Sequence, residues 1–349
     1  MDNWVYLVLL LVAGFLMVLH ELTRNKAFHK VLAFVLVVFS GIRHDVGTDY
    51  RSYVEIFRNV HIRGRYYGIE WGYYYLMRFV SWLNGTQQLV FLIMATATII
   101  FIYKYIDGLS SNRNLSWLLY LCIGPYYLGS FNGVRQALSI AIFAYSLKYA
   151  NKEDYWRFAF LNICGSLFHT SALLMLALYF ILTKTRLTMV KAFCVLLVYT
   201  AVYSTGLVAI AMSKLGYGFY TSRGHLEMDL SYIVFVLIAL CIWLILLLIR
   251  DMDRDYLVFK NLNFLSLIAI LAAYISPGIS NIAFTRFNTY FFITYVVLVP
   301  YIISKLKGTK IRTTAMLVVV VVSISYYFWV TSTASDLLPY QVNLGFFAN

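Results

Sequence analysis

Residues 313–332 read TTAMLVVVVVSISYYFWVTS, an apolar run that no charged side chain interrupts. A helix needs about 20 such residues to cross the hydrocarbon core of a bilayer. Similar runs recur along the 349-residue chain and predict spans near residues 4–20, 28–43, 87–104, 115–129, 131–150, 188–213, 230–249, 262–280 and 286–303. The sequence therefore predicts an all-α, polytopic integral membrane protein with roughly 10–12 transmembrane helices.

The composition agrees with this class. Hydrophobic residues make up 62% of the chain and charged residues 12%, whereas a soluble domain carries about 25% charged residues. The spans use nearly the whole length, so we expect one membrane domain over residues 1–349. The net charge of +13 comes mainly from short loops between spans, where basic residues set topology rather than bind nucleic acid.

Two segments are ambiguous. Residues 71–83 are too short to cross the membrane and are expected at its interface. Residues 155–182 fit either one long tilted span or two half-helices that meet near His169. Placing the basic loops in the cytoplasm puts both termini outside only if the first segment does not cross and the second turns back. We therefore prefer the re-entrant form.

Ionisable residues are costly in membrane spans, so each one is a candidate for function. The stretch GIRHDVGTDY, residues 41–50, places Arg43, Asp45 and Asp49 at the outer end of the second predicted span. Gly47 permits a tight turn that could aim Asp49 back toward the membrane. The alternative is a solvated loop with an arginine that anchors the span. We expect the outer loop of about 44–70 to carry site residues.

Three further polar positions interrupt apolar sequence. Arg135 opens an apolar helix beside Asn132 and Gln136, His169 lies in a polar break between two apolar runs, and Arg286 begins a later span. Both arginines could instead snorkel to the interface, and the histidine could be a hydrogen-bonded packing residue.

The three arginines share a predicted location. On the topology above, Arg43, Arg135 and Arg286 all lie at outer span ends. Three such cations would repel one another unless an anion lay between them, and the arginine fork binds phosphate oxygens bidentately. The sequence thus favours an outward-facing site for phosphate or pyrophosphate, and a lipid-linked pyrophosphate fits a membrane setting.

Several of these residues also occur in a recognisable order. Residues 43–57 fit the pattern R-x-x-x-G-T-D-Y-x-x-Y-x-x-x-F, and Glu70, Gly72 and Tyr73 fit E-x-G-Y. The first pattern resembles the signature of the EpsG family of Wzy-like exopolysaccharide and O-antigen polymerases. The later polar marks are similar to those of the same family, so the resemblance covers about residues 40–300; these marks are Arg135-Gln136, Phe168-His169-Thr170-Ser171-Ala172-Leu173 and Arg286.

The resemblance implies a membrane glycosyltransferase. Such polymerases join undecaprenyl-pyrophosphate-linked repeat units at the outer face of the bacterial cytoplasmic membrane. The implied partners are the lipid-linked donor and acceptor oligosaccharides and the bilayer, with a chain-length regulator protein as a further candidate. No cofactor, metal or nucleic acid is expected, and no H-E-x-x-H, Walker or G-x-S-x-G motif occurs.

For that reaction, Arg43, Arg135 and Arg286 would stabilise the leaving pyrophosphate. Asp49, Asp45 or His169 would act as general base, and the sequence does not choose between Asp49 and His169. The tentative glycan contacts are Tyr50, Tyr53 and Glu70.

Two other functions remain open at this point. A flippase or transporter of lipid-linked oligosaccharide would need polar residues through the whole bilayer, and an O-antigen ligase would share the donor and differ only in the acceptor. A membrane O-acyltransferase has less support, because His169 is the single residue that favours this class.

Overall fold

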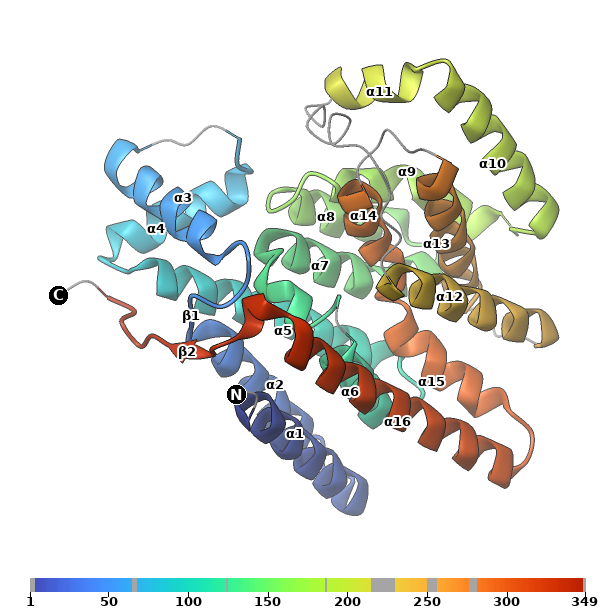
Figure 1. Cartoon of the computed structure of the whole chain (residues 1–349), viewed down its shortest axis with the longest axis horizontal. Coiled ribbons are helices and arrows are strands. Elements are labelled where there is room, and N and C mark those ends of the chain that lie inside the picture. The colour runs from blue at the N-terminus through green and yellow to red at the C-terminus, as the bar shows by residue number, and fades with distance from the viewer. Residues whose placement is uncertain are drawn as a thin grey trace.

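The computed structural model describes residues 4–64, 68–123, 125–185, 187–214, 230–249, 256–275 and 281–347. The described residues are almost entirely helical (Figure 1). Within these described ranges, four helical stretches are long and apolar enough to cross a membrane, namely Trp4–Thr23, Gln87–Leu109, Phe287–Lys305 and Thr309–Thr333. The predicted class, an all-α polytopic membrane protein, is confirmed.

The helices, in chain order, are α1 Trp4–Thr23, α2 Ala27–Gly41, α3 Tyr50–Arg63, α4 Trp71–Trp82, α5 Gln87–Leu109, α6 Arg113–Cys122, η1 Leu128–Phe131, α7 Val134–Asn151, α8 Tyr155–Ser166, α9 Ala172–Lys184, α10 Met189–Ser204, α11 Leu207–Met212, α12 Leu230–Leu248, α13 Leu257–Ile275, α14 Asn281–Phe292, α15 Tyr295–Lys305, α16 Thr309–Thr333 and η5 Ser335–Leu337. Two short strands, β1 Arg43–His44 and β2 Gln341–Val342, pair antiparallel.

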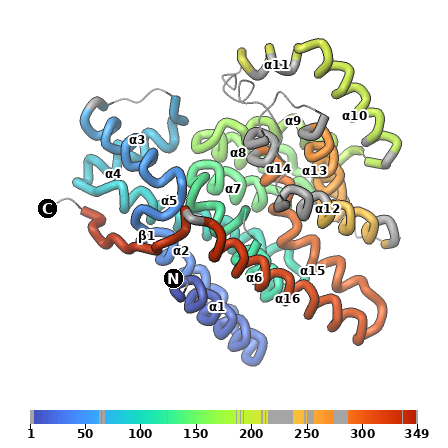
Figure 2. Tube along the Cα trace, viewed as in Figure 1, coloured from blue at the N-terminus to red at the C-terminus, as the bar shows by residue number. Residues whose placement is uncertain are grey.

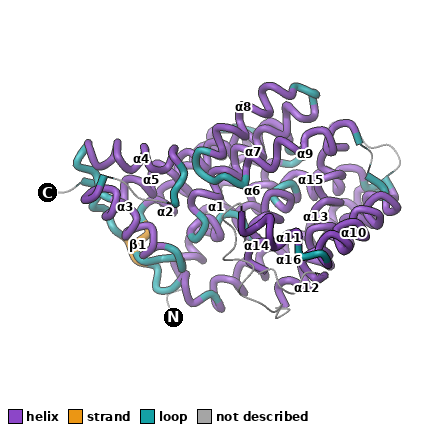
Figure 3. Tube along the Cα trace, turned by 90° about the horizontal axis from the view of Figure 1, so that it is seen from above, coloured by secondary structure: helices purple, strands orange, loops and turns teal. Residues whose placement is uncertain are grey.

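The centre of the molecule is α5, which packs against both α2 and α7. Helix α7 in turn packs against α8 and α9, so the chain spreads outward from α1 and α2 toward α10 and α11 (Figure 2). Seen from above, α3 and α4 lie at one end of the elongated bundle and α10 at the other (Figure 3). Many outward side chains are large and apolar, among them Phe15, Phe34 and Val321, as lipid-facing helices require.

The spans have two chemically different ends. At the end we call the basic end, ion pairs link Lys26 and Arg113 to Asp107, and Lys184 to Glu153. At the opposite end, which we call the β1 end, β1 leads into α3 and α4. The Gln88 amide at the start of α5 donates to the carbonyls of Gly41 and Arg43, at 2.5 and 3.0 Å.

Both ambiguous segments take the broken or short form. Helix α4 has 12 residues, or about 18 Å, which is less than a hydrocarbon core of about 30 Å. Residues 155–184 form two helices, α8 and α9, that pack against each other around a turn that contains His169. Because Lys184 pairs with Glu153, this segment starts and finishes at the basic end.

Two predicted spans are less regular than expected. The run at 115–129 is not one helix, because α6 ends at Cys122 and a 3-10 turn follows at Leu128–Phe131. Pro125 lies in this gap and cannot donate a helical hydrogen bond. The run at 188–213 breaks between α10 and α11, where Gly206 takes a φ of +76°.

The C-terminal segment closes the β1 end. After α16 the chain returns so that β2 pairs with β1, and Gly47 N–H donates to the Asp336 carbonyl at 2.7 Å. The Asn132 amide donates to the Asp336 carboxylate at 2.9 Å. The Tyr340 ring stacks on Phe39 at 4.3 Å. No apolar run or periodic pattern in the sequence predicts this segment.

We expect Tyr340→Ala to destabilise the protein by about 2 kcal/mol, because the substitution removes a partly buried aromatic ring that stacks on Phe39. Thermal unfolding in detergent measures this change. The control is Phe347→Ala, since Phe347 lies in the same segment but is 60% exposed. Equal midpoints for the two variants would show that Tyr340 does not anchor the segment.

Candidate active site

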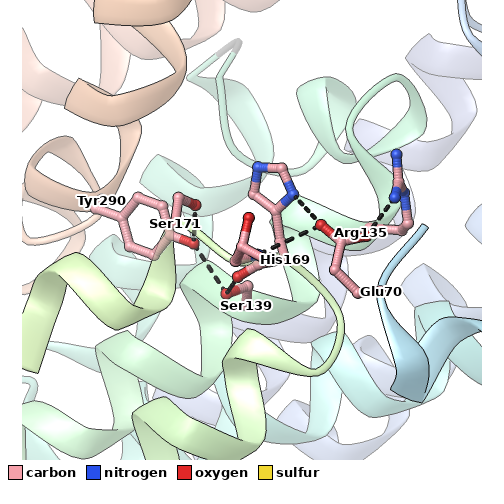
Figure 4. Close-up of polar contacts among 7 residues, drawn as sticks. Glu70, Arg135, Ser139, His169, Ser171 and Tyr290 are labelled. Carbon is pink, nitrogen blue, oxygen red and sulfur yellow. Dashed lines mark hydrogen bonds and ion pairs between the residues drawn. The ribbon is translucent and has the colours of Figure 1, made fainter. Parts of the chain in front are cut away.

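The Glu70 carboxylate joins two other charged or titratable side chains. Its Oε2 forms an ion pair with Nη1 of Arg135, and its Oε1 lies 3.1 Å from Nδ1 of His169 (Figure 4). The backbone N–H of Thr170 also donates to Oε1 at 3.3 Å. These residues come from the start of α4, the first turn of α7 and the turn between α8 and α9, so the fold gathers distant parts of the chain here.

The hydrogen bond between Glu70 and His169 indicates which nitrogen of the imidazole carries a proton. An ionised carboxylate only accepts hydrogen bonds, so the contact requires His169 Nδ1 to carry the proton. In a neutral imidazole the other ring nitrogen, Nε2, is then an acceptor. In this tautomer Nε2 is the nitrogen on the side of the ring away from Glu70, as in other carboxylate–histidine pairs.

The Glu70 carboxylate is held in its ionised form. Burial raises the pKa of Glu70. The hydrogen bond from His169 and the positive charge of Arg135 lower it, and together they outweigh the effect of burial, so the pKa of Glu70 falls below its usual value. A carboxylate in this state is a poor general base and a good partner for two cations or donors.

The cluster is largely enclosed yet reachable. The side chains of Glu70, Arg135 and His169 are 10%, 22% and 21% exposed. Charges act more strongly on a reacting group in such a partly desolvated setting than they do in water. The Arg135 guanidinium also lies over the Tyr73 ring, 5.8 Å from its centroid, which holds the arginine from a second side.

Gly72 allows α4 to approach the α8–α9 turn. Its N–H donates to the Leu167 carbonyl at 2.8 Å, and a Cβ placed on it would lie 2.7 Å from that oxygen. A side chain at this position would push the start of α4, and Glu70 with it, away from His169.

We therefore expect Gly72→Ala to cost about 1–3 kcal/mol, the usual range for overpacking, and to reduce activity by separating Glu70 from His169. Thermal unfolding and activity are measured together. The matched control is Gly14→Ala, because a Cβ at Gly14 meets nothing within 4 Å. A Gly72→Ala protein with unchanged stability and activity would contradict the role of this close contact.

A chain of hydroxyl groups contacts the turn between α8 and α9. Ser171 Oγ lies 2.8 Å from the Tyr290 hydroxyl, which donates to Ser139 Oγ at 2.8 Å, and Ser139 donates to the His169 carbonyl at 3.4 Å (Figure 4). Sequence reasoning missed Ser139 and Tyr290. The spacing of Arg135 and Ser139, four residues apart on one helix face, was a signal that could have found the first of them.

The comparison with known families identifies the family of the chain. Residues 26–342 match the EpsG family. The chain belongs to the EpsG family. No curated protein and no solved structure matches it.

The arginine of the first EpsG motif has different surroundings from Arg135. Arg43 is 1% exposed, and its guanidinium lies 4.8 Å from the ring centroids of both Phe91 and Phe131. It donates to the carbonyls of Ser40 and Phe131 at 2.5 and 3.2 Å. Arg43 thus ties the end of α2 to η1, and the structure does not place it on the accessible face with Arg135.

The acidic residues of the same motif also separate. The Asp45 carboxylate pairs with the exposed Arg51 at 2.6 Å, and the hydrogen bond from Arg51 lowers its pKa. Asp49 directly precedes α3 and is half-buried, with its charge acting on Tyr53. The charge of Arg135 acts on Tyr53 as well, so Tyr53 is a neighbour that Asp49 and Arg135 share.

The two tyrosines of the motif lie in the interior of the EpsG fold. Tyr50 is 2% exposed, contacts Phe91 by stacking and donates to Gln88 at 3.3 Å. Tyr53 is also buried, edge-on to Tyr73. Both rings hold α3 on its neighbours. Arg286 belongs to α14, but its side chain lies outside the part of the chain that the structure describes.

Proposed function

We propose that this EpsG-family protein is a polysaccharide polymerase that joins undecaprenyl-pyrophosphate-linked repeat units by glycosyl transfer. The observation that carries the proposal is the Glu70 carboxylate shared between Arg135 and His169. The Glu70 carboxylate thereby contacts both a cation suited to pyrophosphate, Arg135, and a base suited to a sugar hydroxyl, His169. The family's association with exopolysaccharide and Wzy-like polymerases supports the same activity.

In the proposed reaction, His169 Nε2 takes the proton from the acceptor sugar hydroxyl. The hydroxyl oxygen attacks the anomeric carbon of the donor chain, and the bond from that carbon to the pyrophosphate oxygen breaks. The electron pair leaves with the pyrophosphate, which stays on its lipid carrier. Glu70 stabilises the imidazolium that forms, as a carboxylate does beside a catalytic histidine.

Arg135 acts on the leaving group. As the glycosidic bond breaks, negative charge grows on the pyrophosphate oxygen, and a positioned guanidinium stabilises that charge. The arginine fork can bind two phosphate oxygens at once. Its ion pair with Glu70 and its contact with Tyr73 hold it ready before the substrate arrives.

The distribution of charge supports an outward-facing site in the bacterial cytoplasmic membrane. Lys26, Lys184 and Lys305 lie at the basic end, and loops rich in lysine and arginine remain in the cytoplasm. The cluster of Glu70, Arg135 and His169 lies at the β1 end. On this orientation the reaction takes place at the outer surface.

Deleting the gene in its host and resolving the glycans on a gel tests the proposal. A single repeat unit in place of the polymer ladder supports a polymerase, and re-expression of the wild-type chain should restore the ladder. Full-length polymer left on its lipid carrier would identify a ligase instead. Repeat units trapped on the cytoplasmic face would identify a flippase.

A further inference from the structure

A large apolar groove lies far from the cluster of Glu70, Arg135 and His169. It has a volume of about 1340 Å³ and runs between α6, α12, α15 and α16. Most of the residues that line it are aliphatic. Several of these side chains are exposed: Leu237, Val318 and Val322 are 55%, 55% and 54% exposed. In a bilayer such a surface is covered by hydrocarbon.

The groove has the length of one leaflet. Tyr295 and Lys305, the two ends of α15, both line it. This helix has 11 residues, or about 16 Å at 1.5 Å per residue. Half of a hydrocarbon core of about 30 Å is about 15 Å. The groove therefore suits the acyl chains of a phospholipid from the leaflet at the basic end.

The mouth of the groove is positively charged. Lys305 and Lys307 line it at the basic end, and Lys305 Nζ lies 5.2 Å from the Tyr301 ring centroid at the end of α15. Lys307 is exposed. None of the described residues that line the groove is acidic. Basic pockets between membrane helices on the cytoplasmic side bind anionic lipid head groups.

We propose that this groove is a binding site for an anionic phospholipid, with the phosphate at Lys305 and Lys307 and the acyl chains along α15 and α16. The observations favour it over a polyprenyl carrier, whose pyrophosphate would lie at the β1 end, away from both lysines. The choice against the polyprenyl carrier rests on the proposed function, whereas phospholipid binding in the groove does not require polymerase activity.

Native mass spectrometry of the purified full-length protein tests the site. Phosphatidylglycerol and phosphatidylcholine with identical acyl chains are added at equal concentration, and the ratio of bound adducts is measured. We expect the wild type to prefer phosphatidylglycerol. Lys305→Gln combined with Lys307→Gln should reduce that preference about thirtyfold, since each lysine near an anionic lipid contributes roughly 1 kcal/mol.

The matched control is Lys30→Gln combined with Lys152→Gln. It removes the same charge from exposed basic-end positions that do not line the groove, and it should keep the wild-type preference. Val319→Trp fills the groove without changing charge, so it should reduce the binding of both phospholipids. Equal effects of the two lysine pairs would overturn the proposal, because the preference would then reflect general surface charge.

A competing occupant gives a different result. If the groove holds the carrier's polyprenyl tail, Val319→Trp should reduce binding of undecaprenyl phosphate while the lysine pair leaves the phosphatidylglycerol preference unchanged. That outcome would also overturn the proposal. Loss of phosphatidylglycerol binding in a variant that still makes polymer would leave the proposed function intact, so the two proposals fail separately.

Discussion

Cells that carry Arg135→Ala in place of the wild-type protein should make single repeat units and no polymer ladder. The substitution removes the accessible guanidinium that contacts Glu70 and Tyr73. Loss of one positioned donor to a developing negative charge typically lowers the rate by about 10²–10³-fold. Gel analysis of lipid-linked glycans, with membrane insertion checked by immunoblot, measures the effect.

Two further substitutions sharpen this experiment. Arg135→Lys keeps the charge but loses the planar fork, so it should restore only part of the activity. Arg51→Ala is the control, because Arg51 is also paired with a carboxylate but is 84% exposed and lies outside the cluster; it should leave the ladder unchanged. A normal ladder from Arg135→Ala would remove Arg135 from the reaction.

Replacing His169 by Gln should lower the polymerisation rate by about 10²–10⁴-fold, the range expected when a general base is lost. Glutamine retains polarity and a side chain that can hydrogen-bond to Glu70, so the turn between α8 and α9 should persist. Initial rates of chain extension in membrane vesicles, together with thermal unfolding of the purified variant, separate loss of chemistry from loss of fold.

The two aspartates complete this comparison. Asp45→Asn should have little effect, because its carboxylate faces Arg51 at the surface. Asp49→Asn tests the alternative base that the sequence left open. If Asp49→Asn abolishes extension while His169→Gln retains it, the base is Asp49 and our assignment of His169 is wrong.

The sequence predicted the class of the protein well, because lipid exposure imposes long apolar runs that can be counted directly. It also favoured the break near His169, which the structure has, and it marked Arg135 as a candidate for function, since polar residues in such runs are unusual. It did not show which polar residues meet. Glu70 was expected as a tentative glycan contact, and its bridge between α7 and the α8–α9 turn follows from tertiary packing rather than from local sequence.

Arg43 is a second case in which the sequence did not show the surroundings of a polar residue. Its position beside Asp45 and Asp49 in sequence suggested an accessible phosphate ligand, but the fold encloses its guanidinium between two phenylalanine rings. The role of Asp336 could not be predicted either. A hydrogen bond between Gly47 and a residue almost a whole chain away leaves no pattern in a single sequence.

The hydrogen bond between Gly47 and Asp336 can form only late in translation. The loop of residues 43–50 leaves the ribosome long before Asp336 and β2 do. At about 5–20 residues per second, translation from one to the other takes roughly 15–60 s. Throughout that time β1 has no partner strand. A nascent chain that stops before Asp336 therefore lacks the partners of this loop, so the β1 end is completed only on chains that have been translated past β2.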